Sequence, residues 1–348
     1  MLGNLGSVAQ IVRDSLCDSM VLVAGHEQTC TSDLPHDEPA ILSSHCGAIG
    51  SSPMARAALK QRGSLLIWFD PETVWLAAPT DKRGRSATFT DAAIQACLTL
   101  KALFGLPLRQ ATGLVASLLE RAGLDWAVPD FSTLSCRQKG LNVAIPYRPS
   151  TGALHLLIDS TGIKAEGEGE WFTKKHGPSK PRQWRKVHLG IDADTLEIRA
   201  IEVTGSRVGD APMLPELLDQ IPADQSIGKV SADGAYDTRG CRAAIAARDA
   251  CAVIPARKNA RPWLENTPGA QARNDTVRAT RRLGRAIWRR WSGYHRRSLA
   301  ETKMRCFKLL GERVMARDFD RQVAELQIRA AILNRFTALG TPQTQRVG

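Results

Sequence analysis

The sequence lacks the cysteine spacing of a metal-binding or disulfide-rich protein. It has eight cysteines, but no two form a CxxC pair. Cys17, Cys30 and Cys46 lie near three histidines without the spacing of zinc ligands. Scattered cysteines of this kind are typical of reduced thiols, so we expect a cytoplasmic protein. The pattern argues against a zinc site and against a secreted disulfide scaffold.

Segments that would direct the chain to a membrane are also missing. No basic stretch followed by a short apolar core marks a signal peptide, and no apolar run approaches the ~18 residues of a membrane span. We therefore expect no membrane partner. No internal repeat is present either, so the chain is expected to form one large domain or two ordinary ones.

Positive charge is what the sequence has in excess, and it is concentrated in one segment. The chain has a formal net charge of +12 and a pI near 9.6. Residues 257–308 hold 15 Lys and Arg against 3 Asp and Glu, so this segment alone accounts for the +12, whereas residues 1–53 hold one Arg and six acids. Arginine dominates the basic segment, and its guanidinium group binds phosphate with two hydrogen bonds. The segment predicts nucleic acid or another polyanion as partner, with a solvated basic surface as the alternative.

The first 150 residues divide into two parts by composition. Residues 1–53 are rich in small and polar side chains without sustained periodicity, which predicts a mostly disordered extension. Residues 54–150 predict a mostly helical N-terminal region, with a short apolar strand or docking segment at 64–69. Its helices are expected at 90–104 (capped by Thr90 and closed by Gly105), 108–123 and 132–140. The last two helices with their turn fit a helix-turn-helix that enters a DNA groove, and an ordinary helical bundle fits equally well.

From residue 151 on, the sequence alternates between strand and helix patterns. Short apolar runs predict five strands, at 154–158, 187–191, 197–203, 229–232 and 251–255. Helices are expected from about 211, at 238–249, at 294–308 and at 318–336. We therefore assign residues 151–339 to an α/β domain with a basic insertion at about 257–292, and residues 340–348 to a tail.

Three acids stand at informative places in this order of elements. Asp159 ends the first predicted strand, Asp233 ends the fourth, and Glu301 lies on a late helix. Acids at strand ends lie where α/β sheets usually build sites. Carboxylates brought together repel one another unless a cation lies between them, and hard oxygen ligands select Mg²⁺, with Mn²⁺ as a substitute. The structural alternative is that each acid only caps a helix or forms a turn.

The late helix groups charged and phenolic side chains on one face. At about 100° per residue, Tyr294, Arg297, Glu301 and Lys308 fall within roughly 60° of one another. The opposite face is apolar and consists of Leu299, Cys306, Phe307 and Leu310. A carboxylate held among two cations and a phenol predicts contact with a partner rich in negative charge.

With these motifs, the chain resembles the bacterial insertion-sequence DDE transposases, in particular the insertion-sequence-five family. The matching motifs are residues 159–164 (Asp-Ser-Thr-Gly-Ile-Lys), residues 232–237 (Ala-Asp-Gly-Ala-Tyr-Asp) and the tyrosine–arginine–glutamate–lysine spacing of residues 294–308. The last motif is the most specific of the three. The resemblance covers about residues 54–339.

The resemblance implies a ribonuclease H-like fold, with a mixed sheet flanked by helices. It implies Asp159, Asp233 and Glu301 as the catalytic, metal-binding triad for two Mg²⁺ ions. Arg297 and Lys308 would hold phosphates of the transposon end, with Tyr294 beside them. The implied partners are DNA, as terminal inverted repeats and target, and a second copy of the chain in a synaptic dimer in the bacterial cytoplasm. The implied reaction is cleavage at transposon ends followed by strand transfer.

Two other functions stay open at this stage. One is a metal-dependent nuclease of the same fold that cuts DNA without joining it, and the other is a DNA-binding repressor that has lost catalysis. Several side chains also have two readings. Asp237 is a supporting acid or a turn residue. Lys164 and His188 contact DNA or are solvated strand residues. Trp288 and Trp291 stack on a base or, as we favour, pack internally.

Overall fold

The structure, a computed structural model, describes residues 49–51, 53–68, 73–79, 84, 86–150, 152–166, 175, 183–340 and 344–346. The chain divides into two compact units, residues 1–67 with 339–348 and residues 68–338. Most of the predicted extension at 1–53 lies outside the described residues.

The smaller unit contains a short strand pair and a helix. Strand β1 (Ile49–Ser51) pairs antiparallel with β7 (Thr344–Arg346), and helix α2 (Pro53–Arg62) follows β1. The Arg62 guanidinium donates a hydrogen bond to the Gly340 carbonyl. Residues 49–51 thus form a strand inside the stretch for which we expected disorder, and 344–346 form one inside the expected tail.

The segment expected as a short strand at 64–69 is a 3-10 helix, η1 (Leu65–Trp68). No described strand runs beside it, so its backbone is satisfied by local hydrogen bonds instead of a ladder. In the larger unit, the Trp68 ring packs edge-on against Phe336, with ring centroids 5.6 Å apart.

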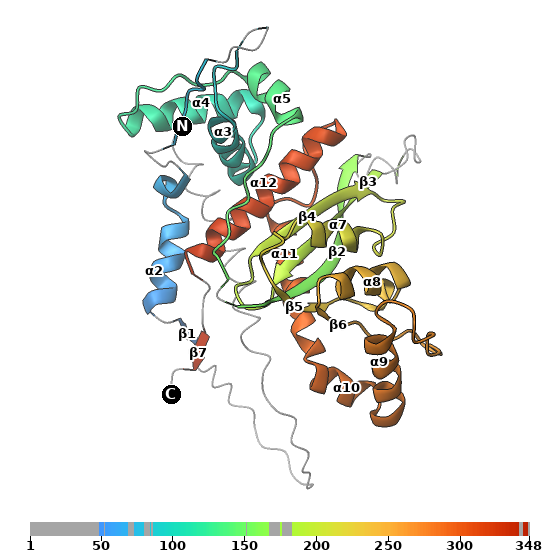
Figure 1. Cartoon of the computed structure of the whole chain (residues 1–348). Helices are drawn as coiled ribbons and strands as arrows, with labels where there is room; N and C mark the ends of the chain where they lie inside the picture. The colour runs from blue at the N-terminus through green and yellow to red at the C-terminus, as the bar shows by residue number, and fades with distance from the viewer. Residues whose placement is uncertain are drawn as a thin grey trace. The chain divides into compact units, whose positions relative to one another are not determined.

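A five-stranded mixed sheet organises the larger unit (Figure 1). Its strands are β2 (Leu154–Glu166), β3 (Gln183–Asp192), β4 (Ile198–Gly205), β5 (Ile227–Ser231) and β6 (Cys251–Val253), in the spatial order β4-β3-β2-β5-β6. The first three strands are antiparallel, and β5 and β6 run parallel to β2. The order and directions confirm the predicted mixed sheet flanked by helices, consistent with a ribonuclease H-like fold.

The alternation of side chains along β2 assigns each face of the sheet to different helices. Leu154, Leu156 and Ile158 are buried against helices α7 (Met213–Asp219) and α8 (Arg239–Ala247). Leu157 and every second residue after it point to the other face, where α11 (Ser298–Leu309) contacts β2 and α12 (Phe319–Ala338) contacts β4. Figure 1 shows α7 and α8 on one side of the sheet and α12 on the other.

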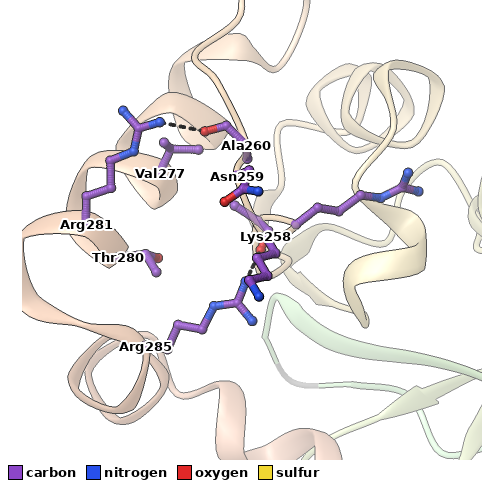
Figure 2. Close-up of a pocket in the computed structure, with 9 residues that line it drawn as sticks. Lys258, Asn259, Ala260, Val277, Thr280, Arg281 and Arg285 are labelled. Carbon is purple, nitrogen blue, oxygen red and sulfur yellow. Dashed lines mark hydrogen bonds between the residues drawn. The ribbon is translucent and has the colours of Figure 1, made fainter.

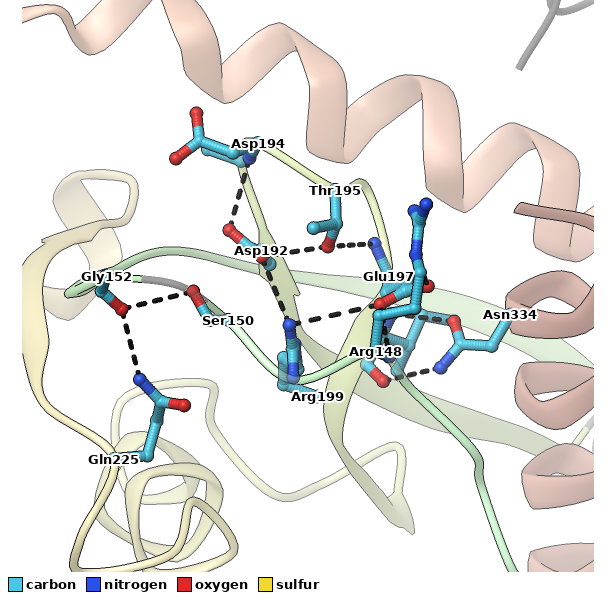
Figure 3. A network of polar contacts seen from close by, with 12 residues as sticks. Arg148, Ser150, Gly152, Asp192, Asp194, Thr195, Glu197, Arg199, Gln225 and Asn334 are labelled. Atoms are coloured by element: carbon cyan, nitrogen blue, oxygen red, sulfur yellow. Dashed lines mark hydrogen bonds and ion pairs between the residues drawn. The ribbon is translucent and has the colours of Figure 1, made fainter. Parts of the chain in front are cut away.

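The turn between β3 and β4 is held by buried charges (Figure 3). Asp192 accepts hydrogen bonds from the Asp194 amide, the Thr195 hydroxyl and the Arg199 guanidinium. The next acid, Glu197, accepts two bonds from Arg148, one from its backbone amide at 2.9 Å and one from its Nε at 2.8 Å. This network holds the turn at 192–195 and fixes the chain just before it enters β2.

Three helices precede the sheet. They are α3 (Asp91–Phe104), α4 (Leu108–Arg121) and α5 (Phe131–Lys139). The Thr90 hydroxyl caps α3 by accepting from the Ala93 amide at 3.1 Å, and Gly105 ends it in the left-handed conformation, both as predicted. The segment between α4 and α5, residues 122–130, is longer than the three- or four-residue turn of a helix-turn-helix.

The two basic side chains of α5 are both paired with acids. Arg137 binds Asp91 at 2.7 Å, and Lys139 lies 3.9 Å from Asp320. Gln138 donates to the Arg321 carbonyl, so α5 is also fastened to the start of α12. Reading of a DNA groove by this region stays a prediction.

No single helix in the described ranges is long and apolar enough to cross a membrane. The consecutive helices α3 and α4 are long and apolar enough only when they are counted together, and they are bent by 109° relative to each other. The apolar side chains of α3, including Ile94, Leu98 and Leu100, are buried within the unit.

Candidate active site

Asp159 lies within a strand, and this corrects the expectation that it ends one. Strand β2 continues to Glu166, and Asp159 pairs with Leu189 of β3. Its parallel neighbour β5 is shorter, and the last paired residues of the two strands are Leu157 and Ser231. The apolar run stopped at Ile158, but β2 continues because antiparallel pairing with β3 supports its polar half. The side of Asp159 toward β5 is therefore left open.

The parallel register explains how a second acid comes to lie beside Asp159. Asp233 follows Ser231 by two residues, just as Asp159 follows Leu157 by two. Asp233 leaves the sheet at the 3-10 helix η2 (Gly234–Tyr236), and its carboxylate accepts from the Ala235 amide at 2.8 Å. The turn function weighed as an alternative is therefore present, and its side chain is still 41% exposed toward the site.

The third acid, Glu301, lies on α11, which follows a series of helices in the chain. Helix α9 (Ala270–Leu283) leads through Gly284 to α10 (Arg285–Ser292), and Gly293, at φ +74°, ends α10. Residues 294–297 form a separate 3-10 helix, η3 (Tyr294–Arg297), so the expected single helix over 294–308 is wrong in its first turn. The 3-10 helix ends at Arg297, and α11 begins at Ser298.

Arg297 connects the three acids. Its Nη2 lies 3.0 Å from Asp159 Oδ1 and 3.9 Å from Asp233 Oδ2, and its Nη1 lies 3.0 Å from Glu301 Oε1. The guanidinium side chain is 16% exposed, Asp159 is 13% exposed, and Glu301 is 63% exposed. One cation thus bridges acids that come from a strand, a turn and a helix.

Burial and charge act against each other on these groups. Burial raises the pKa of Asp159, and Asp233 adds to this, while the Arg297 guanidinium opposes it. For Arg297 burial lowers the pKa, but Asp159, Tyr294 and the other acids outweigh it, so the pKa is raised. The site therefore keeps Arg297 charged. It also favours a second cation beside the Asp159 carboxylate.

The two remaining predicted site residues are Tyr294 and Lys308, and they lie at different distances from Arg297. Tyr294 packs against Trp288 at 5.7 Å between ring centroids, and burial raises the pKa of its hydroxyl. Lys308 lies seven residues beyond Glu301 on α11, about 10.5 Å along the axis at 1.5 Å per residue. In the described part of the chain, the Lys308 side chain makes no hydrogen bond or ion pair.

The opposite face of β2 carries a polar network that no sequence pattern predicted. Asp210 accepts from the Ser160 hydroxyl at 2.8 Å and from Lys186 Nζ at 3.1 Å, and it lies 3.7 Å from His188 Nδ1. His188 is completely buried and also bonds Thr204, so its reading as a solvated strand residue is wrong. Asp210 follows β4 in a turn without any motif, and only the antiparallel register reveals its neighbours.

Two residues of the predicted 232–237 motif support the turn after Asp233. Tyr236 is buried, and its hydroxyl oxygen has no hydrogen-bond partner among the described residues. Burial raises the pKa of this phenol, and Asp210, Asp233 and Asp159 raise it further. Asp237 is buried between the guanidinium groups of Arg242, at 3.2 Å, and Arg273, at 3.1 Å. Asp237 therefore joins the turn to α8 and α9 and is more than a simple turn residue.

The two tryptophans of α10 differ in burial. Trp288 is 3% exposed and packs as expected, but Trp291 is 76% exposed, so the favoured packing interpretation is wrong for Trp291. They are three residues apart on α10, so they are neighbours on the helix surface and differ in what covers them.

Comparison with known families agrees with this architecture. Two family models, each described as a transposase DDE domain, match the chain, one over residues 60–168 and the other over residues 150–335. The second match alone covers more than half of the chain and includes β2, β5 and α11. The chain therefore belongs to the DDE transposases, enzymes of DNA transposition that depend on divalent metal ions.

The three acids fit such ions in chemistry, since carboxylate oxygens are the ligands that Mg²⁺ and Mn²⁺ prefer. Their arrangement is set by Arg297, because the acids are spread around its guanidinium. Among the described residues no group of three Asp, Glu, His or Cys side chains converges tightly enough to hold an ion. Binding of an ion by all three acids thus requires Arg297 to move away from them.

Proposed function

We propose that this chain is a transposase of the insertion-sequence-five type whose catalytic residues are Asp159, Asp233 and Glu301. It would cut DNA at the ends of its element and join the new 3′ end to target DNA. The observation that carries this is the meeting of three acids, from β2, the β5 turn and α11, around the single guanidinium of Arg297. Separate structural roles would not require the three to share one cation.

The same three carboxylates would hold two Mg²⁺ ions, or Mn²⁺ in their place. Such ions supply activation of the attacking oxygen and stabilisation of the leaving 3′-oxygen. Asp159 is the most buried of the three acids, so its carboxylate would be the least mobile ligand of the ions. The more exposed Asp233 and Glu301 would adjust to the phosphate being cut.

Arg297 would have two positions in this reaction. Before DNA arrives, its single positive charge reduces the repulsion among the three carboxylates. When a phosphodiester enters, its charge gives the guanidinium a new partner, and the carboxylates become available. Arg297 would then hold the phosphate next to the bond being broken, with Tyr294 beside it and Lys308 further along the strand.

The proposed roles of the domains follow the boundaries predicted from the sequence. Residues 151–339 would carry catalysis, with residues 257–292 as a basic insertion, and the mostly helical region at 54–150 would bind DNA. Two transposon ends must be cut together, so we propose a homodimer in the synaptic complex.

The test is cleavage of a duplex that carries the DNA bordering the gene. Asp159→Asn and Glu301→Gln should abolish cleavage and leave DNA binding nearly intact, because the positive charge of the site is kept. Asp194→Asn is the matched control, since Asp194 is an exposed acid that pairs with Arg296 away from the triad. Cleavage that survives in the Glu301→Gln variant would remove this residue from the site.

A second assay separates the transposase from a nuclease of the same fold. A duplex with a pre-cut 3′ end is offered together with target DNA, and joined products are measured. Joined products support transposition. Cutting without joining would favour the nuclease, and binding without either reaction would favour the repressor.

A further inference from the structure

A basic pocket lies beside the turn that carries Asp233, apart from the triad (Figure 2). It has a volume of about 500 Å³ and lies between the segment after β6 and helices α9 and α10. Arg257, Lys258, Arg281 and Arg285 line it, and none of the described residues that line it is acidic. Figure 2 shows Arg281, Thr280 and Arg285 on one side and Lys258 to Ala260 on the other.

The arginines are held in place by backbone carbonyls and keep most of their donors unused. Arg281 Nη2 donates to the Ala260 carbonyl at 2.8 Å, and Arg285 Nη2 donates to the Ala256 carbonyl at 3.0 Å. Each guanidinium has five N–H donors, so most of them stay available for a ligand. No carboxylate pairs with either side chain in the described ranges. Their charge is therefore not neutralised within the chain.

Next to the pocket, hydrogen bonds and a stacked ring hold the segment after β6 against α9. The Asn274 side chain accepts from the Trp263 amide at 2.8 Å and donates to the Trp263 carbonyl at 2.9 Å. Arg273 stacks on the Trp263 ring at 4.1 Å and donates to the Arg261 carbonyl at 2.7 Å. Asn259, in the left-handed conformation at φ +64°, turns the chain between Arg257 and Ala260. These contacts tie the segment that carries Lys258 and Asn259 to the helix that carries Arg281.

One neutral group in the pocket also lacks a partner. The hydroxyl oxygen of Thr280 is buried, and no hydrogen-bond partner for it exists among the described residues. Its side chain lines the pocket between Arg281 and Arg285 (Figure 2). A buried hydroxyl without a partner is unfavourable in free energy, and an oxygen-rich ligand would relieve this.

We propose that this pocket is a phosphate-binding site that holds one backbone phosphodiester of a DNA strand. The phosphate oxygens would accept from Arg281, Arg285 and the Thr280 hydroxyl, with Lys258 closing the opposite side. Arg257 joins the pocket to the site, because it donates to the carbonyls of Gly234 and Ala235, directly after Asp233. A filled pocket would therefore position the strand relative to the turn that carries Asp233. The choice of DNA as the source of the phosphate rests on the proposed function.

The test measures binding of a short fluorescein-labelled duplex by anisotropy, in EDTA so that no cleavage occurs, over a series of salt concentrations. Arg281→Gln and Arg285→Gln should each weaken binding about tenfold and reduce the salt slope by about one. Thr280→Val keeps the charge and the shape, and it should weaken binding severalfold without changing the slope. Arg278→Gln is the matched control on the same helix, because Arg278 pairs with Asp275 outside the pocket.

Equal effects of Arg278→Gln and Arg281→Gln would overturn the proposal, since they would indicate a diffuse basic surface. An unchanged affinity in Thr280→Val would also overturn it. A second arm titrates inorganic phosphate by calorimetry. Binding of inorganic phosphate that Arg281→Gln abolishes, together with unchanged duplex binding in that variant, would assign the pocket to a free phosphate and overturn the choice of DNA. The cleavage assay of Asp159→Asn is independent of all these readouts, so failure of the proposed function is distinguishable.

Discussion

The Nη2 atom of Arg297 lies 3.0 Å from Oδ1 of Asp159, although the two residues are 138 positions apart in the chain. The same guanidinium also binds Glu301, so the charge that α11 brings to the sheet is balanced before any ligand arrives. In the proposed metal-bound state, an ion would take the place of this arginine among the carboxylates.

The first prediction concerns metal affinity. Arg297→Ala should increase the affinity for Mn²⁺ in the absence of DNA, because the ion no longer competes with a guanidinium for Asp159 and Glu301. Electron paramagnetic resonance of free Mn²⁺ gives the affinity directly. The same variant should bind DNA more weakly and show a smaller salt slope.

Arg296→Ala is the control for that experiment. Arg296 is the neighbouring arginine, but it binds Asp194 and the Ala193 carbonyl. Its loss should leave Mn²⁺ affinity unchanged. If both variants bind Mn²⁺ as the wild type does, Arg297 does not occupy the place of the ion.

The second prediction concerns the buried cluster around Asp237. Asp237→Asn leaves Arg242 and Arg273 buried without their acid, which should lower the free energy of unfolding by about 3–5 kcal/mol. Asp275→Asn removes an acid from an exposed pair on α9 and should change it by less than about 1 kcal/mol. Urea denaturation measures both, and similar values for the two variants would contradict the structural role of Asp237.

The third prediction compares two tryptophans of one helix. Trp288→Ala should cost about 3–5 kcal/mol of stability because it leaves a cavity, whereas Trp291→Ala should change stability by no more than about 0.5 kcal/mol. The difference follows from their exposed fractions of 3% and 76%. Thermal unfolding of the two variants checks it, and a large loss in Trp291→Ala would show that α10 is covered in solution.

The fourth prediction is a pH dependence of stability. The pKa of His155 is lowered to about 4, first by burial and then by Arg296 and Lys229, whereas an exposed histidine titrates near 6.5. The unfolded chain therefore binds a proton between these values that the folded chain does not bind. The stabilising contribution is complete above about pH 6.5 and is lost as the pH falls toward 4.

Denaturation at a series of pH values tests this. His155→Gln keeps a polar partner for the Ser231 hydroxyl, which His155 Nε2 contacts at 2.8 Å. The variant should show a flatter decline between pH 6.5 and 4 than the wild type. An identical decline would assign the pH dependence to other groups.

Local patterns predicted the elements well because their causes are local. The alternation and length of apolar runs located all five strands of the sheet, and the capping residue Thr90 marked the start of α3. The polar second half of β2 was missed because its stability comes from β3, which no local pattern reports. The 3-10 helix over Tyr294–Arg297 was missed because 3-10 turns are common at helix ends and no residue pattern distinguishes them from the first turn of an α-helix.

The candidate site was predictable in its acids and not in its arrangement. Asp159, Asp233 and Glu301 stand out by position and motif, but the motif indicated only a phosphate-binding role for Arg297. Its contact with Asp159 arises from the packing of α11 on β2. The neighbours of Asp210 depend on the long-range strand register, and the basic pocket around Thr280 depends on helix packing. Neither therefore has a recognisable pattern in the sequence.

The parallel register of β2 and β5 also determines which changes in chain length the protein can tolerate. Leu157 pairs with Ser231, and each acid follows two residues later. Deletion of one residue between Ser231 and Asp233, or between Leu157 and Asp159, would turn one acid to the opposite side of the sheet. Homologous elements should therefore keep these two short spacings constant.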